Sequence, residues 1–124
     1  MTPNKIKLHN ISNVLELVFD QHSYHLPAEY LRISSPSAEV KGHGPDQEVL
    51  QFGKRHVAIK KVEPVGNYAL KLIFSDGHDS GIYSWPYLFE LSMQHEVRWQ
   101  NYLEQLHQAN KTRDPDTSVV KIML

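Results

Sequence analysis

The sequence contains no cysteine. That absence excludes disulfides, thiolate zinc sites, cysteine-ligated iron–sulfur clusters and a cysteine nucleophile. No run of 18 apolar residues occurs, so we expect no transmembrane helix. The first residues, Met1–Lys5, lack the apolar core of a signal peptide, which favours a cytoplasmic protein.

The sequence also lacks the common cofactor motifs. It has no glycine-rich phosphate loop with a Walker lysine, no Rossmann fingerprint and no Gly-x-Ser-x-Gly nucleophile elbow. Neither sign of charge dominates, because 13 Lys and Arg nearly balance 14 Asp and Glu. Such a weak net charge argues against general affinity for nucleic acid or anionic membranes. We therefore expect no cofactor, no nucleic-acid partner and no membrane partner.

The length and composition that are present fit one small domain. The chain has 124 residues, of which 40% are hydrophobic, enough for a single core. We predict one domain over residues 1–109 and a polar tail over 110–124. Residues 34–54 are rich in Ser, Gly, Pro and charged side chains, which predicts a mobile surface loop. The apolar run 119–124 could pair as a late strand or remain disordered.

Alternating apolar and β-branched residues predict several short strands. Asp76-Gly77 between apolar runs indicates a hairpin, because both positions tolerate positive φ. His22 and His25 are three apart on one predicted strand and so point to opposite faces. The predicted strands are residues 6–9, 14–19, 22–26, 57–62 and 68–74, with a further short strand after the Asp-Gly turn.

Three helices are predicted, at residues 27–32, 85–91 and 93–108. Ser84 has the side chain of an N-cap, and Pro86 falls in the first helical turn, where its missing N–H costs nothing. The last helix is amphipathic, since four apolar side chains recur at i, i+3, i+4 and i+7: Trp99, Tyr102, Leu103 and Leu106. Together the elements predict an α+β fold, a small antiparallel sheet of hairpins with helices on one face.

Four segments in this order resemble the DUF971 family, the domain also found at the N-terminus of γ-butyrobetaine hydroxylase. They resemble its short bacterial stand-alone members over roughly residues 10–108. The segments are residues 26–32 (Leu-Pro-Ala-Glu-Tyr-Leu-Arg), the turn at Ser75–Tyr83, the helix start at Trp85–Leu91 and the helix at Trp99–Leu106.

In the hydroxylases this domain carries a structural zinc, held by a Cys-x-Cys-x-x-Cys run after a Leu-Arg pair and by a later histidine. The resemblance places the three cysteines on Ser35, Ser37 and Val40 of this chain and the histidine on His78. A neutral serine hydroxyl is a poor zinc ligand and valine is none. The sequence therefore predicts that the thiolate site is absent here.

The resemblance also bears on function. The iron and 2-oxoglutarate chemistry of the hydroxylases belongs to a separate, larger domain, so it implies no enzyme activity for this chain. Family members are also fused to P-loop ATPases of the Mrp/ApbC type, which carry iron–sulfur clusters. This implies a possible accessory role in cluster delivery, by association only.

Eight histidines leave a metal hypothesis open, although we expect no bound metal. His78 could join Asp76 or Asp79 and a further histidine in a two-histidine, one-carboxylate iron site. His43 is the best candidate for that histidine, because it lies near the position of the missing ligands, and His56 is the next. This alternative is a metal-responsive protein of iron–sulfur metabolism; against it, no metal-ligand spacing is met.

Two further alternatives have simpler explanations. Asp76, His78 and a serine such as Ser80 could act as a catalytic group, but turn formation and helix capping already account for these residue types. The basic run 54–61 could bind RNA, but strand alternation sends its lysines to opposite faces.

We therefore predict a non-catalytic interaction or accessory domain, a monomer or weak dimer, with an unidentified protein partner. The predicted interaction surface joins the region after the first helix to the Asp-Gly turn, where family members carry their metal. Aromatic and arginine side chains concentrate binding energy in such surfaces. The residues assigned to it are Tyr30, Arg32, His78, Trp85 and Tyr87.

Overall fold

The computed structural model describes residues 1–42, 44 and 46–115. Ten elements follow one another along this part of the chain. They are β1 (Lys5–His9), β2 (Val14–Phe19), β3 (His22–Pro27), α1 (Ala28–Ile33), α2 (Ala38–Lys41), β4 (Ile59–Val65), β5 (Ala69–Phe74), β6 (Ile82–Ser84), α3 (Trp85–Met93) and α4 (His95–Gln108). The α+β prediction is confirmed, but the strands form two sheets instead of one.

The first sheet is an antiparallel meander in the order β1-β2-β3. Its central strand alternates strictly: Leu15, Leu17 and Phe19 are buried, while the residues between them are half-buried on the other face. Glu16 on that outer face stands opposite Lys7 of β1 and His25 of β3. Because side chains alternate with period two, this register decides which polar groups meet on the outer face.

The second sheet has the order β4-β5-β6, again antiparallel. The predicted hairpin at Asp76-Gly77 is present, and Gly77 has φ +88°, the left-handed region that glycine enters without a steric penalty. Strand pairing resumes only at Ile82, opposite Lys71, so the connection is longer than a two-residue turn. The extra residues of this connection include His78.

Both sheets and helices α1 and α3 contribute to a single hydrophobic core. Asn13, in the turn before β2, links the two sheets: its side-chain amide donates to the carbonyl of Val57 (2.8 Å) and accepts from the N–H of Ile59 (3.1 Å). Phe19 of the first sheet meets Phe89 of α3 edge to face, with ring centroids 5.2 Å apart. The sheets are therefore two parts of one packed unit.

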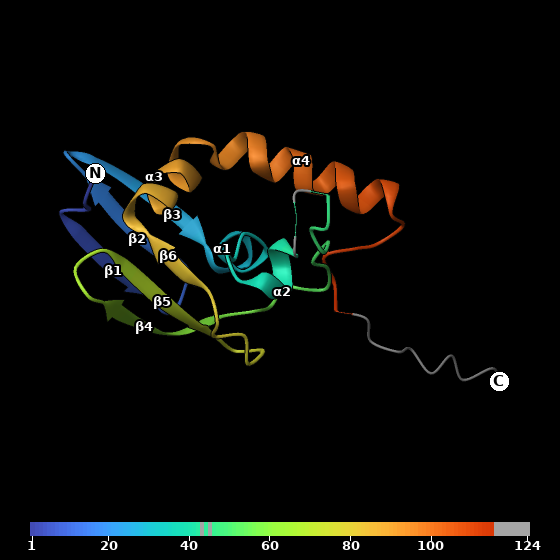
Figure 1. The fold of residues 1–124 in the computed structure, drawn as a ribbon, viewed down its shortest axis with the longest axis horizontal. Coiled ribbons are helices and arrows are strands. Elements are labelled where there is room, and N and C mark those ends of the chain that lie inside the picture. Colours follow the sequence, from blue (N-terminus) through green and yellow to red (C-terminus); the bar gives the residue numbers. More distant parts are fainter. Residues whose placement is uncertain (43, 45, 116–124) are drawn as a thin grey trace.

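Helix α3 begins where the sequence predicts, whereas α1 begins one residue and α4 two residues later than predicted. Ser84 caps α3 by accepting from the N–H of Tyr87 at 3.3 Å, and Pro86 lies in the first turn. Helix α4 runs along one side of the molecule, beyond α1 and α2 (Figure 1). Of its predicted apolar stripe, Tyr102 and Leu106 are buried, and Trp99 and Leu103 are half-buried. Among the described residues, no helix combines the length and apolar character needed to cross a bilayer.

Two expected surface segments contain ordered contacts. Within 34–54, the short helix α2 forms, and Ser35, Ser37 and Val40 are buried. After α4, the guanidinium of Arg113 makes a two-pronged ion pair with the buried carboxylate of Glu29, at 2.6 and 2.9 Å. The mobility of 34–54 stays a prediction. The possible strand at 119–124 lies outside the described residues.

Candidate functional site

His78 lies at the centre of a buried polar cluster. Its Nε2 is 2.8 Å from the Ser35 hydroxyl and 3.3 Å from that of Ser37, and its Nδ1 is 3.2 Å from a carboxylate oxygen of Glu39. Only 2% of the His78 side chain is exposed. Because a carboxylate only accepts, Nδ1 carries the proton and donates to Glu39, and Nε2 accepts from Ser35. We call Ser35, Ser37 and His78, together with the carboxylate of Glu39 at their solvent-facing edge, the buried cluster; the Glu39 side chain itself is 72% exposed.

Local backbone structure brings the buried cluster together. Ser35 and Ser37 occupy the short link between α1 and α2, and His78 lies in the connection after β5. The backbone N–H of His78 donates to Asp76 Oδ1 at 3.2 Å, which closes the turn and directs the imidazole inward. Gly81 packs against Ser35 so closely that an added Cβ would overlap the serine hydroxyl. The serines that the resemblance set at cysteine positions therefore do surround His78.

The environment keeps His78 neutral. Burial lowers the pKa of His78, and the nearby positive charge of Arg32 lowers it further, while Glu39 and Asp76 oppose this shift. The hydroxyls of Ser35 and Ser37 provide hydrogen-bond partners for a neutral imidazole. They would hold a divalent cation poorly, because serine is not deprotonated near neutral pH.

The buried cluster has the hydroxyl–imidazole–carboxylate order of nucleophilic triads. Ser35, however, has no exposed surface at all. Its hydroxyl already hydrogen-bonds to His78 and Ser37, so the geometry satisfies buried polar groups instead of presenting a nucleophile.

The carboxylates proposed as partners of the His78 ring are differently placed. Asp76 accepts from Arg32 Nε at 2.9 Å and from Lys54 Nζ at 3.1 Å, and these donors, with its bond to the His78 backbone, lower the pKa of Asp76 against the effect of burial. Asp79 is exposed. His43 lies outside the described residues. Among the described residues, the carboxylate that hydrogen-bonds to the His78 ring is that of Glu39, whereas Asp76 bonds to the backbone N–H of His78.

The five residues of the predicted interaction surface occupy unlike positions. Tyr30, Arg32 and His78 are buried: the exposed fractions of the whole residues, backbone included, are 0%, 6% and 6%. Tyr30 donates its hydroxyl to the carbonyl of Leu91 at 2.7 Å. Trp85 is half-buried and donates its indole N–H to the carbonyl of Asn67 at 2.7 Å. Of the five, only Tyr87 lines a pocket.

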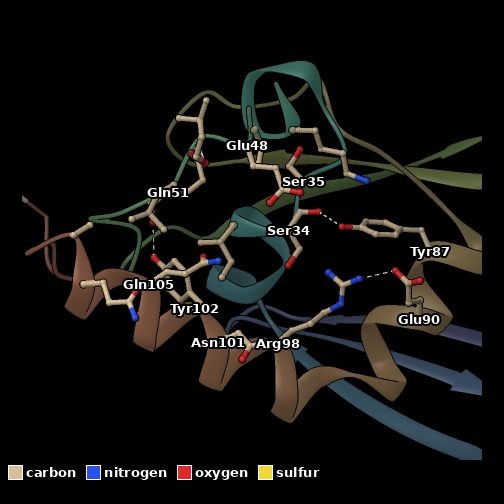
Figure 2. A pocket seen from close by; sticks show the side chains of 17 residues that line it. Ser34, Ser35, Glu48, Gln51, Tyr87, Glu90, Arg98, Asn101, Tyr102 and Gln105 are labelled. Atoms are coloured by element: carbon tan, nitrogen blue, oxygen red, sulfur yellow. Dashed lines mark hydrogen bonds and ion pairs between the residues drawn. The ribbon is translucent and has the colours of Figure 1, made fainter. Parts of the chain in front are cut away.

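That pocket, of about 690 Å³, opens between α4, α2, the end of α1 and residues 48–51 (Figure 2). Two tyrosines in its wall are held by hydrogen bonds: Tyr87 donates to the carbonyl of Ser34 at 2.6 Å and Tyr102 to that of Gln51 at 2.8 Å. Burial raises the pKa of Tyr102 to about 12, so its phenol stays protonated at neutral pH. Hydrogen bonds to the backbone therefore hold both tyrosine side chains in place.

Two of the charged side chains at the pocket form an ion pair, and two cations lie over the Tyr87 ring. Arg98 contacts Glu90 at 2.6 Å, and its guanidinium lies 5.9 Å from the Tyr87 ring centroid (Figure 2). Lys41 Nζ lies 4.6 Å from the same ring. An arginine and a lysine over one aromatic ring are favourable cation–π contacts and hold the ring in place.

Sequence reasoning missed most of the pocket. Its α4 wall comes from the polar side of the helix, where Asn101, Gln105 and Gln108 recur at i, i+4 and i+7. That spacing is visible in the sequence and marks one face of a helix. What the sequence does not reveal is the segment 48–51, which closes the opposite wall.

The basic run predicted at 54–61 is largely paired in the structure. Lys54 contacts Asp76 at 3.1 Å, Arg55 contacts Asp114 at 3.0 Å, and Lys61 lies 4.0 Å from Glu63. These carboxylates dilute the positive charge that an RNA strand would need.

Comparisons with solved structures place the chain among close relatives. A solution NMR structure matches with a TM-score of 0.83 and 55% identity, covering 99% of this chain and 98% of the other. A second NMR structure matches with a TM-score of 0.77 and 45% identity, covering 92% and 86%. The third is a crystal structure of a protein of unknown function of the DUF971 family from Acidithiobacillus ferrooxidans, with a TM-score of 0.61, 39% identity, and 73% and 92% coverage.

A search of curated proteins found no match. A family model described as gamma-butyrobetaine hydroxylase-like, N-terminal, matches residues 6–89, which include the whole of both sheets except Lys5, together with α1, α2 and most of α3. The chain therefore belongs to the gamma-butyrobetaine hydroxylase-like N-terminal family, also called DUF971.

Proposed function

We propose that this domain is a non-catalytic interaction module whose pocket receives an extended segment of a partner protein. The observation that carries this proposal is the pocket beside α4, which has Arg98 and the hydrogen-bonded side chains of Tyr87 and Tyr102 in its walls. Tyrosine and arginine dominate the energetics of protein interfaces, and pockets that are already formed lose little entropy on binding.

The chemistry of the pocket favours a polypeptide. The side-chain amides of Asn101 and Gln105 each offer a donor and an acceptor, as does every unit of a peptide backbone. The amide of Gln51 already accepts from Arg32 at 3.2 Å and donates to the Val49 carbonyl at 3.1 Å. Arg98 pairs with Glu90, and Lys41 and Glu48 add one charge of each sign, so the pocket lining carries no net charge that would select a charged small molecule. An extended segment could exchange hydrogen bonds with the amides while its side chains pack on the tyrosine rings.

The alternative function, a metal-responsive accessory role centred on His78, has less support. Both ring nitrogens of His78 already hydrogen-bond to protein groups. A cation would have to displace these bonds and would gain hydroxyl ligands in return. We propose that the module acts in the cytoplasm as a monomer or weak dimer.

Site-specific photocrosslinking in the native cell tests the pocket. A benzophenone amino acid placed at Gln105, which is exposed and lines the pocket, should crosslink one defined protein. The same group at His107, exposed on α4 but outside the pocket lining, is the matched control and should not. Identical products from both positions, or none from Gln105, would contradict the proposal.

A blocking variant sharpens the test. Asn101→Arg inserts a long side chain at an exposed pocket position and should abolish the crosslink from Gln105. Glu104→Arg adds the same side chain at an exposed position on α4 outside the pocket lining and should leave the crosslink intact. Equal effects of the two variants would show that charge, and not the pocket, controls binding.

A further inference from the structure

Three potential metal ligands meet on the outer face of the first sheet. His9 comes from β1, Glu16 from β2 and His25 from β3. Among the described residues, these form the one group of three histidine or acidic side chains whose ligand atoms all lie within 4.8 Å of one another. We call them the sheet-face cluster.

The distances within the sheet-face cluster are close to those of a metal site. His9 Nε2 lies 2.7 Å and His25 Nε2 lies 3.8 Å from the same oxygen, Oε1 of Glu16. A tetrahedral zinc ion with bonds of about 2.05 Å requires about 3.3 Å between neighbouring ligand atoms. Small side-chain rotations would therefore bring all three ligands to zinc distance.

We propose that the sheet-face cluster binds one zinc-like divalent cation through two imidazoles and one carboxylate, with water completing the coordination shell. This goes beyond the proposed interaction function and uses none of the pocket residues. Imidazole and carboxylate are suitable ligands for zinc, and a site with three protein ligands leaves one position open. Both histidines reach the carboxylate oxygen through Nε2, so the same nitrogen of each ring faces the proposed ion.

The surroundings orient the carboxylate. Ser23 of β3 donates its hydroxyl to the second oxygen of Glu16 at 3.0 Å, which leaves Oε1 directed at the imidazoles. Such a partner behind a ligand fixes its orientation and improves metal affinity. The three ligands stand on hydrogen-bonded strands, which hold a site more firmly than loops do.

The charges near the cluster are mixed. Glu16 accepts hydrogen bonds from His9 at 2.7 Å and from Ser23 at 3.0 Å. Lys7 stands opposite Glu16 in the strand register, and Lys5 lies two residues further along the same face. A bound cation would meet these ammonium groups, but both lysines are exposed and can turn into solvent.

The site is distinct from the position at which the resemblance places metal in the hydroxylases. The position assigned from the resemblance surrounds the buried His78. In the sheet-face cluster, His25 is exposed and His9 and Glu16 are half-buried. An ion can therefore reach the sheet-face cluster without opening the core.

Zinc titration of the full, untagged chain tests the proposal by isothermal calorimetry at pH 7.5. We expect saturation at one equivalent, with Co²⁺ giving the intense visible absorption of four- or five-coordinate cobalt. His9→Gln, Glu16→Gln and His25→Gln should each weaken zinc binding at least about tenfold, and Ser23→Ala should weaken it less. All four positions lie on the outer face of the sheet, where these substitutions leave the core intact.

His22→Gln is the matched control, because His22 is exposed on the same strand but is not in the cluster. It should bind zinc as the parent does. Substoichiometric binding by the parent, or equal affinities for the parent, His9→Gln and His25→Gln, would overturn the proposal. A loss caused by His22→Gln as large as that caused by His25→Gln would do the same. Because no pocket residue changes, a negative result would leave the proposed interaction function standing.

Discussion

The buried cluster and the sheet-face cluster contain the same chemistry in opposite settings. Each joins imidazole to a carboxylate and a serine hydroxyl. At His78 the imidazole is enclosed and both nitrogens bond to protein, so its role is to satisfy a buried polar network. On the sheet face two imidazoles share one carboxylate oxygen within reach of solvent. Access and ligand number, more than residue type, separate a structural histidine from one that could bind a cation.

The largest expected effect is a gain in unfolding free energy when the buried cluster is converted into a thiolate zinc site. Ser35→Cys, Ser37→Cys and Val40→Cys together place three thiols where the resemblance sets the cysteines, next to His78. Zinc at 1,000 times its dissociation constant should stabilise this variant by about 4 kcal/mol, because only the folded state presents the ligands together. Urea unfolding with and without zinc measures this difference.

The conversion needs two controls. Carrying it out in a His9→Gln background removes any contribution of the sheet-face cluster. Adding His78→Ala should then sharply reduce the zinc-dependent gain. If zinc stabilises the triple variant no more than the parent, the positions assigned from the family resemblance do not converge on His78.

The second largest effect is the loss of unfolding free energy when the His78 imidazole is removed. His78→Ala removes the partner of two buried hydroxyls, Ser35 and Ser37. Leaving buried polar groups without partners costs about 1–3 kcal/mol, so unfolding free energy should fall by about that amount. Urea denaturation at pH 7.5 measures it. The exposed His22→Ala should change it by less than about 0.5 kcal/mol, and an equal loss in both variants would refute the structural role of His78.

The pH dependence of the unfolding free energy also distinguishes the buried cluster from the sheet-face cluster. Burial lowers the pKa of His78 in the folded state, so the unfolded chain takes up this proton first on acidification. The contribution of neutral His78 is thus complete above about pH 6.5 and declines as the pH falls below it, by at most about 1.4 kcal/mol per pH unit. Burial lowers the pKa of His95 as well, which adds a decline in the same direction.

Urea unfolding between pH 8 and pH 5 measures this decline. His78→Gln should flatten the curve by removing one of the two titrating groups, while His22→Gln should leave it unchanged. Parallel curves for the parent and His78→Gln would contradict the assignment of a buried neutral imidazole.

The smallest effect is expected on the sheet face without metal. Glu16→Gln removes a solvent-accessible carboxylate that accepts hydrogen bonds from His9 and Ser23, and such surface contacts contribute little to stability. We expect no resolvable change in the urea midpoint at pH 7.5. Since the pKa of Glu16 is lowered, its contribution is present above about pH 4.5 and disappears below that value. A large loss at pH 7.5 would show that the cluster supports the fold and not only a cation.

Much of the fold follows from local sequence signals. The predicted strands and helices agree with the structure to within a few residues, because alternation, the Asp76-Gly77 turn and the Ser84 cap act through nearest neighbours. Helix α2 was not predicted, because it lies in the segment 34–54 that was expected to be a loop. The division into two sheets was not predicted. It depends on which strands pair and on the bridge made by Asn13, a residue with no distinguishing local pattern.

The candidate sites required more than local signals. The sequence itself determined that no thiolate could hold a metal, that His22 and His25 face opposite ways, and that α4 has one apolar side. Tertiary structure alone decided that Tyr30 and Arg32 are buried and that residues 48–51 wall a pocket. It also decided that His9, Glu16 and His25 meet. Strand register and side-chain burial arise from contacts between residues far apart in the chain. The type and spacing of residues along a single segment do not specify these contacts.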